Sequence, residues 1–566
     1  MPIDGMPARV KRVLHSWLIP FVVYFAAALF ATRPLASAGA DHIISRLSPE
    51  DVLHQIWILG WDMHALTTDP GKLFQANILY PARDVLAYSD HMLGALPLFA
   101  PLWLLTGNPL LAFNGVTFAG FLLSALFMHL LIRRWTGSPL AAYVAGVSFA
   151  FAPWRLVNFH WPHLLSVQYL PLLLLALDRA ALTGRVGIGL LAAAILTLQA
   201  LCSSTLAYMT FVLAGSYLLA DAIVRGFRGR QKAWLALAVG TLTPMLVLVP
   251  LSIPYLRARD LGTLSNAPNF IADLAKVTTF RWVLAAHVGW EAVAVIGLFA
   301  LLSLHRGQQT SSTGRVRALS AMIAFVSALA IAMGPSGGWL SPYSWMASIV
   351  PGFRLFRIPS RFGILAAFAG SVLAGLAVAS LTSSFDRQRH RVLWLLVGIV
   401  SLGVISRPLW SSAPTRTFPL PAGAAVPSVY RWLAAHGDGR PLLELPATTV
   451  GVTALTKEGF AEALAVYFSG YHWLPLLNGY TSYIPNSYRL LRAYAIRLPD
   501  TDALQVLVDC TGLRWLLFHG MKPEDEPRWA NSPGLTLRSA FQSDGREERL
   551  YEVGLSPRSA CPLPLQ

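Results

Sequence analysis

Charge is scarce in this sequence. Only 13% of its 566 residues are Asp, Glu, Lys or Arg, while 55% are hydrophobic and 18 are tryptophan. Soluble globular proteins carry about 25% charged residues, so an ordinary soluble protein is excluded. Apolar runs close to the length that crosses a bilayer recur along most of the chain. The composition therefore predicts a polytopic α-helical membrane protein.

Signature motifs of several enzyme classes are missing as well. The sequence contains no Walker A, H-E-x-x-H or paired C-x-x-C motif, which argues against ATPases and zinc enzymes of those kinds. The formal net charge of +16 comes from basic residues scattered between apolar runs, without a basic tract that has interleaved aromatic residues. We therefore expect no nucleic-acid partner.

The basic residues predict how the chain crosses the membrane. The short basic loops fall on one side if the apolar stretch 92–106 is interfacial or re-entrant, and the positive-inside rule places that side in the cytoplasm. The N-terminus is then cytoplasmic, and its basic residues before a long apolar run indicate a retained helix, not a cleaved signal peptide. Eleven spans are expected, near residues 17–36, 109–132, 139–153, 164–180, 186–201, 204–223, 233–253, 287–304, 318–334, 362–382 and 391–406.

The opposite side receives the larger loops and the C-terminal segment. After about residue 407 the charge density becomes ordinary, and the runs PLLELP and RWLLFH are typical of strands. We predict two domains: a transmembrane domain over 1–406, whose long outer loop 37–108 is acidic and contains interfacial helices, and a small extracytoplasmic α/β domain over 407–566.

The acidic loop begins with an adjacent pair, Glu50 and Asp51, in the stretch SPED. One interpretation is structural, with Ser48 as a helix N-cap and Asp51 as the acid of a capping box. The amphipathic helix that follows would then lie at the membrane surface, in contact with lipid and anchored by Trp57 and Trp61. This interpretation gives Asp51 no part in chemistry.

A second interpretation is catalytic. The polar face of this helix carries Asp51, His54 and Asp62 in place of the Lys and Arg that favour anionic lipid. The loop continues as NILYPARDVLAYSDHMLG, which adds Asp90 and His91 before the apolar stretch. Such carboxylates suit general-base catalysis on a hydroxyl group. The two interpretations of Asp51 are compatible, because a cap would also hold the carboxylate in place.

The layout resembles the GT-C superfamily of integral-membrane glycosyltransferases, which take a sugar from a polyprenyl-phosphate carrier. The resemblance is carried by SPEDVLHQIWILGWDMHAL, ANILYPARDVLAYSDHMLG and FRLFRIPSRFG, and it is to the bacterial branch with a YP segment in the first loop and an R-x-P-x-R-F segment before a late helix. It implies a multi-pass protein of the bacterial inner membrane. The sequence departs from the family members that carry a clean D-x-D or E-x-D metal motif in the first outer loop, which leaves open whether a divalent metal ion takes part.

The resemblance implies roles for the acids of the first loop. Asp51 would be the general base that activates an acceptor hydroxyl, which attacks the anomeric carbon and displaces polyprenyl phosphate with inversion. Asp90 would orient the acceptor or bind a metal, or it only caps a turn. Weaker candidates are Glu50 for catalysis, and His54 and His91 for substrate binding.

Three arginines, Arg354, Arg357 and Arg361, stand just before a late span on the outer side, against the positive-inside trend. Charge near hydrocarbon is costly without a use, and arginine binds phosphate oxygens bidentately. We expect Arg357 and Arg361, and less so Arg354, to bind the donor phosphate. The alternative is that they extend to lipid headgroups.

Other functions remain open from the sequence. The main alternative is a transporter or flippase of a lipid-linked saccharide, which would carry polar or broken-helix signals in mid-span, often in two matching halves. A ligase or polymerase of surface polysaccharide is a third option. The acceptor of a transferase would be a glycan, a lipid or a protein, and the aromatic segment YFSGYHWLPLLNGYTSYIPNSY either contacts a sugar or lies on the membrane.

Cysteine is rare, with three residues in the chain. Cys202 is expected to be a buried thiol at the end of a span. Cys510 and Cys561 fall in the segment assigned outside the cytoplasm, where disulfides persist. They form a bridge if the RWLLFH and RLYEV strands are neighbours; otherwise they are two separate thiols.

Overall fold

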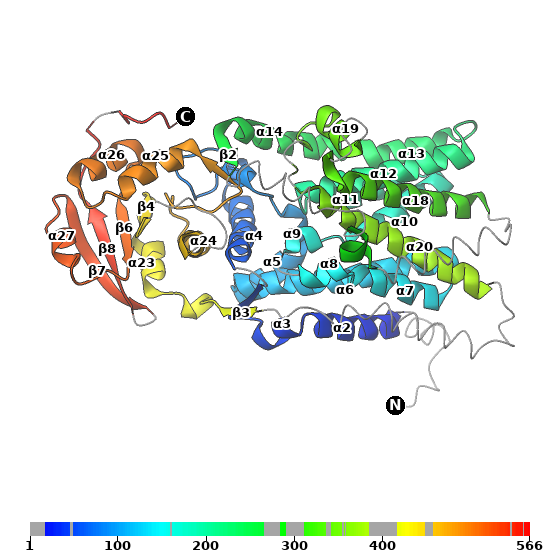
Figure 1. Ribbon diagram of the computed structural model, residues 1–566, viewed down its shortest axis with the longest axis horizontal. Coiled ribbons are helices and arrows are strands. Elements are labelled where there is room, and N and C mark those ends of the chain that lie inside the picture. The colour runs from blue at the N-terminus through cyan, green and yellow to red at the C-terminus, as the bar shows by residue number, and fades with distance from the viewer. Residues whose placement is uncertain are drawn as a thin grey trace. The chain divides into compact units, whose positions relative to one another are not determined.

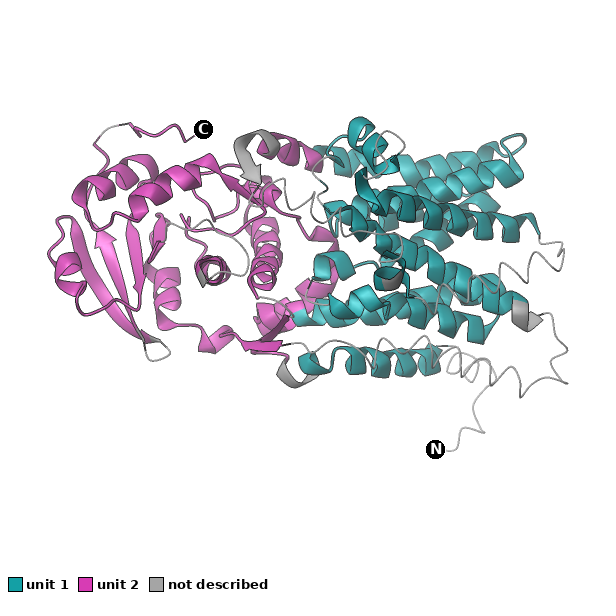
Figure 2. Ribbon diagram, in the orientation of Figure 1, with its two compact units in different colours: residues 1–37, 114–250, 268–415 teal, residues 38–113, 251–267, 416–566 magenta. Residues whose placement is uncertain are grey.

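The computed structural model describes most of the chain. The described residues are 17–565 without 46–48, 159–160, 265–282, 290–310, 336–340, 354–355, 357, 384–415, 448–456, 544–545 and 559. They form two compact units, each assembled from separate stretches of sequence (Figure 2). Unit 1 comprises residues 1–37, 114–250 and 268–415, and unit 2 comprises 38–113, 251–267 and 416–566.

Unit 1 is helical throughout its described residues (Figure 1). Its elements, of which α3, α6 and α14 continue into unit 2, are α2 (Ile19–Ala31), α3 (Arg33–Ala38), α6 (Pro109–Thr136), α7 (Pro139–Ala150), α8 (Pro153–Val157), α9 (Pro162–Leu165), α10 (Tyr169–Thr183), α11 (Val186–Ala200), α12 (Ser204–Arg225), α13 (Gln231–Leu242), α14 (Met245–Leu261), the π-helix η6 (Leu284–Val288), α18 (Ser312–Ala332), α19 (Pro342–Ile349), the 3-10 helix η9 (Pro359–Phe362) and α20 (Gly363–Ser383).

The helices of unit 1 have the length and composition of membrane spans at six places in the described chain, which supports a membrane protein. These are Pro109–Thr136, Pro162–Thr183, Ser204–Arg225, Gln231–Ala258, Ser312–Ala332 and Pro359–Ser380. The predicted count of eleven is not confirmed. The predicted spans near 17–36, 139–153 and 186–201 correspond to shorter apolar helices, whereas 391–406 and nearly all of 287–304 lie outside the described residues.

Small residues let these helices pack closely, as is common between helices in a membrane. A β-carbon added at Gly189 of α11 would lie 2.3 Å from the carbonyl oxygen of Ala236 in α13. Gly240 of α13 faces Ala192 of α11 in the same contact, and Gly375 of α20 meets Ala145 of α7. The glycine-rich apolar runs are therefore compatible with a tightly packed bundle.

Ion pairs tie several helix ends of unit 1 together. Asp178 of α10 accepts a hydrogen bond from Arg317 of α18 at 2.7 Å, and Arg317 also donates to the carbonyl of Trp135 at the end of α6. Asp221 of α12 pairs with Arg225 at 2.7 Å and with Arg230 of the following loop. The C-terminal ends of α6, α10 and α12 and the first turns of α18, with their basic residues, therefore meet at one end of this unit.

Unit 2 combines the first loop with the C-terminal segment. Its elements are β1 (His42–Ser45), α4 (Glu50–Thr68), the 3-10 helices η3 (Pro70–Lys72), η4 (Val85–Tyr88) and η5 (Leu93–Ala95), α5 (Leu96–Thr106), β2 (Gly262–Leu264), β3 (Arg416–Pro419), η10 (Gly423–Ala425), α23 (Ser428–His436), β4 (Leu442–Leu445), α24 (Lys457–Ser469), β5 (Tyr483–Pro485), α25 (Asn486–Ala495), α26 (Thr501–Thr511), β6 (Trp515–His519), α27 (Glu526–Ala530), β7 (Leu535–Ser543) and β8 (Arg546–Val553).

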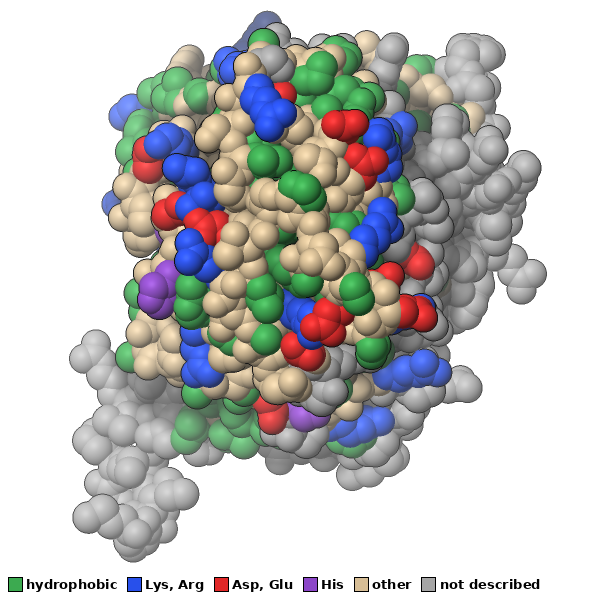
Figure 3. Space-filling model, turned by 90° about the vertical axis from the view of Figure 1, so that its left-hand side faces the viewer, with side chains coloured by type: hydrophobic (Ala, Val, Ile, Leu, Met, Phe, Trp, Pro, Cys, Tyr) green, Lys and Arg blue, Asp and Glu red, His purple; other side chains and the backbone are tan. Residues whose placement is uncertain are grey.

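A four-stranded sheet of order β4-β6-β8-β7 carries the C-terminal part of unit 2. The predicted PLLELP and RWLLFH strands are confirmed as β4 and β6, which pair in parallel, whereas β6–β8 and β8–β7 are antiparallel. Helices α25 and α26 add Leu491, Leu504 and Leu507 to the core on one face. On the side of unit 2 in Figure 3, acidic and basic side chains are interspersed, as on a surface that faces water.

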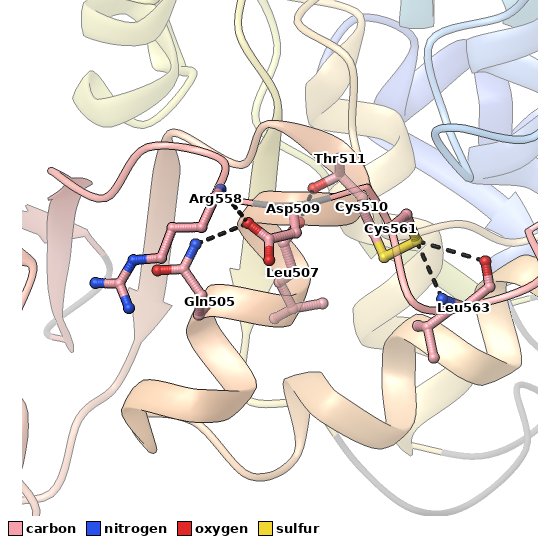
Figure 4. The surroundings of a disulfide bond; sticks show 8 residues. All are labelled: Gln505, Leu507, Asp509, Cys510, Thr511, Arg558, Cys561 and Leu563. Atoms are coloured by element: carbon pink, nitrogen blue, oxygen red, sulfur yellow. Dashed lines mark hydrogen bonds between the residues drawn. A yellow bond between two sulfur atoms is a disulfide. The ribbon is translucent and has the colours of Figure 1, made fainter.

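A disulfide joins Cys510, in the last turn of α26, to Cys561 in the C-terminal tail (Figure 4). Their α-carbons lie 4.3 Å apart, and 51 residues separate them in sequence. The strands on which the prediction depended are neighbours, because Trp515 of β6 pairs with Glu552 of β8. Asp509 also holds the tail, since its carboxylate accepts from the Arg558 N–H at 2.8 Å. Cys202 is the buried free thiol.

Two short ladders show how distant segments join within unit 2. Strand β1, just before α4, pairs antiparallel with β3, so that Ile43 lies opposite Phe418. Strand β2 pairs antiparallel with β5, with Thr263 opposite Ile484. The first loop, the segment after α14 and the C-terminal segment therefore share one folded unit.

Candidate active site

Helix α4 places the acidic pair at its start. The helix begins at Glu50. Pro49 is therefore the N-cap residue and not the first residue of the helix, and it makes no side-chain capping bond. Ser48, the predicted cap, lies outside the described residues. The Asp51 carboxylate also contacts the C-terminal segment, because Tyr480 Oη donates to Asp51 Oδ1 at 2.9 Å.

The helix is buried on nearly all sides, which corrects the expectation of an amphipathic helix at the membrane surface. Trp57 and Trp61 are 2% and 7% exposed. The Trp57 indole N–H donates to Asn77 Oδ1 at 3.2 Å, and that of Trp61 donates to the Leu73 carbonyl at 2.7 Å. The rest of the first loop thus folds back on the helix and satisfies both indoles. They are internal residues and not lipid anchors.

The three acids of α4 differ in exposure. Glu50 is 3% exposed and Asp62 is fully buried, while Asp51 between them is only partly buried. Asp51 and Asp62 are eleven residues apart, or roughly 16 Å along a helix that rises 1.5 Å per residue. Asp51 is therefore the acid of this helix that a substrate reaches most readily.

Two histidines of the first loop lie in different places. His54 is buried next to Asp51, with its ring stacked on Trp57 at 5.6 Å and edge-on to Tyr480 at 5.8 Å between centroids. The ring of His91 lies 6.0 Å from that of Tyr255, and its backbone N–H donates to Tyr255 Oη at 3.0 Å. Of the two predicted histidines, His54 is thus the one that lies beside Asp51.

A second acidic cluster surrounds Tyr255. The charges of Asp90 and Asp62 both act on its hydroxyl group. Asp62 Oδ2 accepts a hydrogen bond from the Met92 N–H at 3.4 Å, and Asp62 Oδ1 has no hydrogen-bond partner in the described part of the chain. Burial raises the pKa of Asp62 well above its usual value, although the bond from Met92 opposes this shift. Burial therefore favours the protonated form of Asp62.

The segment that carries Tyr480 is paired to the first loop by its backbone. The Leu79 N–H donates to the Asn478 carbonyl at 2.9 Å, and the Leu476 N–H donates to the Asn77 carbonyl at 2.6 Å. Asn77 also donates from its side chain to the Leu474 carbonyl at 3.1 Å. The aromatic segment singled out in the sequence thus lies along ANILYPA, and it contains Tyr480, two residues after Asn478.

Of the three predicted phosphate-binding arginines, the structure describes one. Arg354 and Arg357 lie outside the described residues. Arg361 is in η9 of unit 1, partly buried, with its guanidinium 5.9 Å from the centroid of the Trp161 ring. Its role therefore stays a prediction. No group of three or more His, Cys, Asp or Glu side chains that could hold a metal occurs among the described residues.

Sequence reasoning missed Tyr480, which lies 429 residues from Asp51. The available signal was its aromatic and amide-rich neighbourhood, which indicated a contact without naming the partner. Asp62 was seen on the polar face of the helix, yet nothing in the local pattern distinguishes a fully buried acid from a partly exposed one. Both distinctions depend on segments that are far apart in sequence.

Comparison with known proteins finds distant structural similarity to solved structures. No protein-family model matches the chain, and neither does any curated protein. Among solved structures, the chain is similar to the oligosaccharyltransferase of Archaeoglobus fulgidus, in a complex with zinc and sulfate. The match has 11% sequence identity and a TM-score of 0.43, and it covers 88% of this chain and 67% of the other. A likeness at this level does not by itself assign a fold or a function.

Proposed function

We propose that this protein is a membrane glycosyltransferase that moves a sugar from a polyprenyl-phosphate carrier to an acceptor outside the cytoplasm. Asp51 is the general base. It takes the proton of the acceptor hydroxyl as the oxygen attacks the anomeric carbon, and the bond from that carbon to the phosphate oxygen breaks with inversion. Polyprenyl phosphate leaves with the bonding electron pair.

The observation that carries this proposal is the placement of Asp51. It is a partly exposed carboxylate at the first turn of an otherwise buried helix, in a chain with six described helices that are long and apolar enough to cross a membrane. A general base has to meet its substrate hydroxyl within hydrogen-bond reach, which fully buried acids such as Asp62 do not allow. The aromatic segment that reaches Asp51 also offers the flat apolar faces and amides that suit a sugar.

The donor, the acceptor and the location belong to the same proposal. Arg357 and Arg361 bind the donor phosphate, with Arg354 in a lesser role, because the guanidinium fork matches phosphate oxygens. Asp90 orients the acceptor, which is a glycan, a lipid or a protein. The basic residues that meet at one end of unit 1 support a cytoplasmic end there, in a bacterial inner membrane. Residues 407–566 then lie outside the cytoplasm.

A direct assay tests the proposal. Purified protein in detergent is incubated with a panel of polyprenyl-phosphate sugars and with glycan, lipid and peptide acceptors, and the release of polyprenyl phosphate is measured. We expect release with at least one donor, and release slowed by about 10²–10⁴-fold in Asp51→Asn. Movement of an intact lipid-linked saccharide across reconstituted vesicles, without release of the lipid phosphate, would instead favour a flippase.

A further inference from the structure

Tyr480 reaches the candidate base from the opposite end of the sequence. Its hydroxyl donates to Asp51 Oδ1 at 2.9 Å, and its ring stands edge-on to His54. The side chain is buried at 7% exposure, whereas Asp51 is only partly buried. The Tyr480 hydroxyl thus donates a hydrogen bond to one oxygen of the Asp51 carboxylate.

The backbone beside Tyr480 is held by a second carboxylate. Glu462 of α24 is 4% exposed, and its Oε2 accepts from the Gly479 N–H at 2.9 Å. Its Oε1 accepts from Arg492 at 2.6 Å and from the Asn478 amide at 3.3 Å. Asn478 also accepts from the Glu444 N–H of β4 at 2.7 Å, which ties this turn to the sheet. The two residues before Tyr480 are therefore held in place, Gly479 through its backbone and Asn478 through its side chain.

Close packing leaves the Tyr480 turn little freedom. A β-carbon at Gly479 would lie 2.3 Å from Leu79 Cγ, so that only glycine fits against the first loop at this point. The Leu79 N–H also donates to the Asn478 carbonyl at 2.9 Å. The position of the phenol relative to α4 is thus set by the fold of unit 2 and not by the rotamer of one side chain alone.

We propose that Tyr480 is a positioning residue that holds the Asp51 carboxylate in the orientation needed to take the acceptor proton. This inference rests on the proposed function, because the orientation of Asp51 matters for turnover only if Asp51 is the base. The phenol holds one oxygen of the carboxylate by a hydrogen bond. The C-terminal segment is then part of the catalytic apparatus and not only a substrate-binding appendage.

The surroundings keep Tyr480 a donor. Burial raises the pKa of Tyr480 above its ordinary value. The negative charge of Asp51, the hydrogen bond to Asp51 and the charge of Glu50 raise this pKa further. The phenol therefore keeps its proton at neutral pH and does not itself act as a base. Among the described residues, the titratable groups near this pair include Glu50 and His54 on α4, and Glu462 with its partner Arg492 on α24 and α25. Helix α24 packs against α4.

The test compares two tyrosines that each donate to a buried or partly buried carboxylate in unit 2. Tyr480→Phe removes the bond to Asp51. Tyr430→Phe is the matched control, because Tyr430 Oη donates to Glu444 Oε2 at 3.0 Å away from Asp51. For Tyr480→Phe we expect kcat to fall roughly tenfold to a hundredfold, as small misplacements of catalytic groups do, with KM for the donor unchanged.

The pH profile separates positioning from a general loss of structure. An ionised carboxylate that loses a hydrogen-bond donor is easier to protonate, so the acidic limb of the kcat profile should move to higher pH in Tyr480→Phe and stay in place in Tyr430→Phe. If Tyr480→Phe fails to fold, 3-fluorotyrosine at position 480 provides the second measurement. Its more acidic phenol donates more strongly, and the acidic limb should move to lower pH.

The outcomes distinguish the two proposals. Full activity of Asp51→Asn would overturn the proposed function. A slowed Asp51→Asn together with wild-type kcat and pH profile in Tyr480→Phe, or an unmoved profile in the fluorotyrosine protein, would overturn the positioning role and leave the function in place. In the double variant Asp51→Asn with Tyr480→Phe, we expect no further loss beyond Asp51→Asn, because the two groups act as a unit.

Discussion

The buried acids of unit 1 differ in their surroundings from the acids of α4 in unit 2. The acids compared in unit 1 are Asp178 and Asp221. Arg317 neutralises Asp178, and Arg225 and Arg230 neutralise Asp221. In unit 2, Asp51 accepts a hydrogen bond from the Tyr480 phenol, and Asp62 accepts from a backbone N–H while its other oxygen has no partner among the described residues. A guanidinium holds each of the two buried acids of unit 1 in an ion pair, whereas Asp51 is partly exposed at the start of α4 and is the proposed base.

This contrast predicts that the acids of the two units respond to mutation in opposite ways. Loss of an ion-paired acid should lower stability, because it leaves a buried cation unpaired. Loss of Asp51 should lower activity and leave stability nearly unchanged.

The largest expected effect is that of Asp51→Asn on turnover. The amide preserves the shape of the side chain but removes the base, so kcat should fall by about 10²–10⁴-fold, the usual contribution of general-base catalysis. Initial rates of polyprenyl phosphate release measure the loss, and thermal unfolding in detergent should give the wild-type midpoint. A parallel loss of activity and stability would mean that Asp51 is only a helix-capping residue.

Asp178→Asn should produce the reverse pattern. Asp178 is 1% exposed, and its removal leaves Arg317 unpaired in a partly buried place. Breaking such a pair costs about 3–5 kcal/mol, which denaturant unfolding of the detergent-solubilised protein would detect. In the double variant Asp178→Leu with Arg317→Met, no charge is stranded, and most of the stability should return. An unchanged midpoint in the single variant would contradict the comparison.

Removal of the disulfide should lower the stability of unit 2 without affecting catalysis. Replacing Cys510 and Cys561 together by serine opens a loop closed over 51 residues, and the chain-entropy model sets the loss at about 4 kcal/mol or less. We expect a lower unfolding midpoint with kcat preserved at a temperature where the variant is folded. Cys202→Ala is the control that leaves the bridge intact. Alkylation of Cys510 and Cys561 in non-reduced native membranes would show that the bridge is absent.

Arg361→Ala and Arg357→Ala should weaken donor binding without removing the base. Loss of one bidentate phosphate contact should raise the dissociation constant roughly tenfold, as a charge-assisted hydrogen bond of about 1.5 kcal/mol predicts. Lysine at either position should recover the affinity only in part, because it lacks the planar fork. Unchanged binding of a polyprenyl-phosphate sugar by both alanine variants would return these arginines to the role of lipid anchors.

The smallest effect concerns a third arrangement, in which His519 of β6 lies between two acids of unit 2. Burial alone lowers the pKa of His519, but hydrogen bonds to Glu444 and Glu548 raise it to about 9. The histidine thus binds its proton more tightly in the folded state than in the unfolded state, where the pKa is about 6.5. Its contribution to stability is complete below pH 6.5 and is lost as the pH rises through about 9.

Unfolding measured between pH 6 and pH 10 tests this sign. Wild-type protein should become less stable as the pH rises across that window, and His519→Gln should show a flatter dependence. The effect is modest, since the His519 side chain is 32% exposed and water screens its ion pairs. A steeper decline in His519→Gln than in the wild type would refute the assignment.

Much of the architecture could be predicted from local patterns. The runs near 109–132, 204–223 and 318–334 are apolar over the length of a span, and they are long helices in the structure. The strand patterns at PLLELP and RWLLFH were also confirmed. The number of spans was harder to predict, because composition does not reveal how far a helix continues: α7 has 12 residues and α11 has 15.

The sequence by itself determined that this is a helical membrane protein with a small C-terminal sheet, since hydropathy and strand alternation depend on neighbouring residues. Only the tertiary structure decided which polar residues meet. Trp57 and Trp61 have the pattern of interfacial anchors, yet both are internal because the first loop folds over them. Tyr480 meets Asp51 across 429 residues, and Arg317 meets Asp178 across 139. Such contacts depend on how distant segments pack, which no local periodicity encodes.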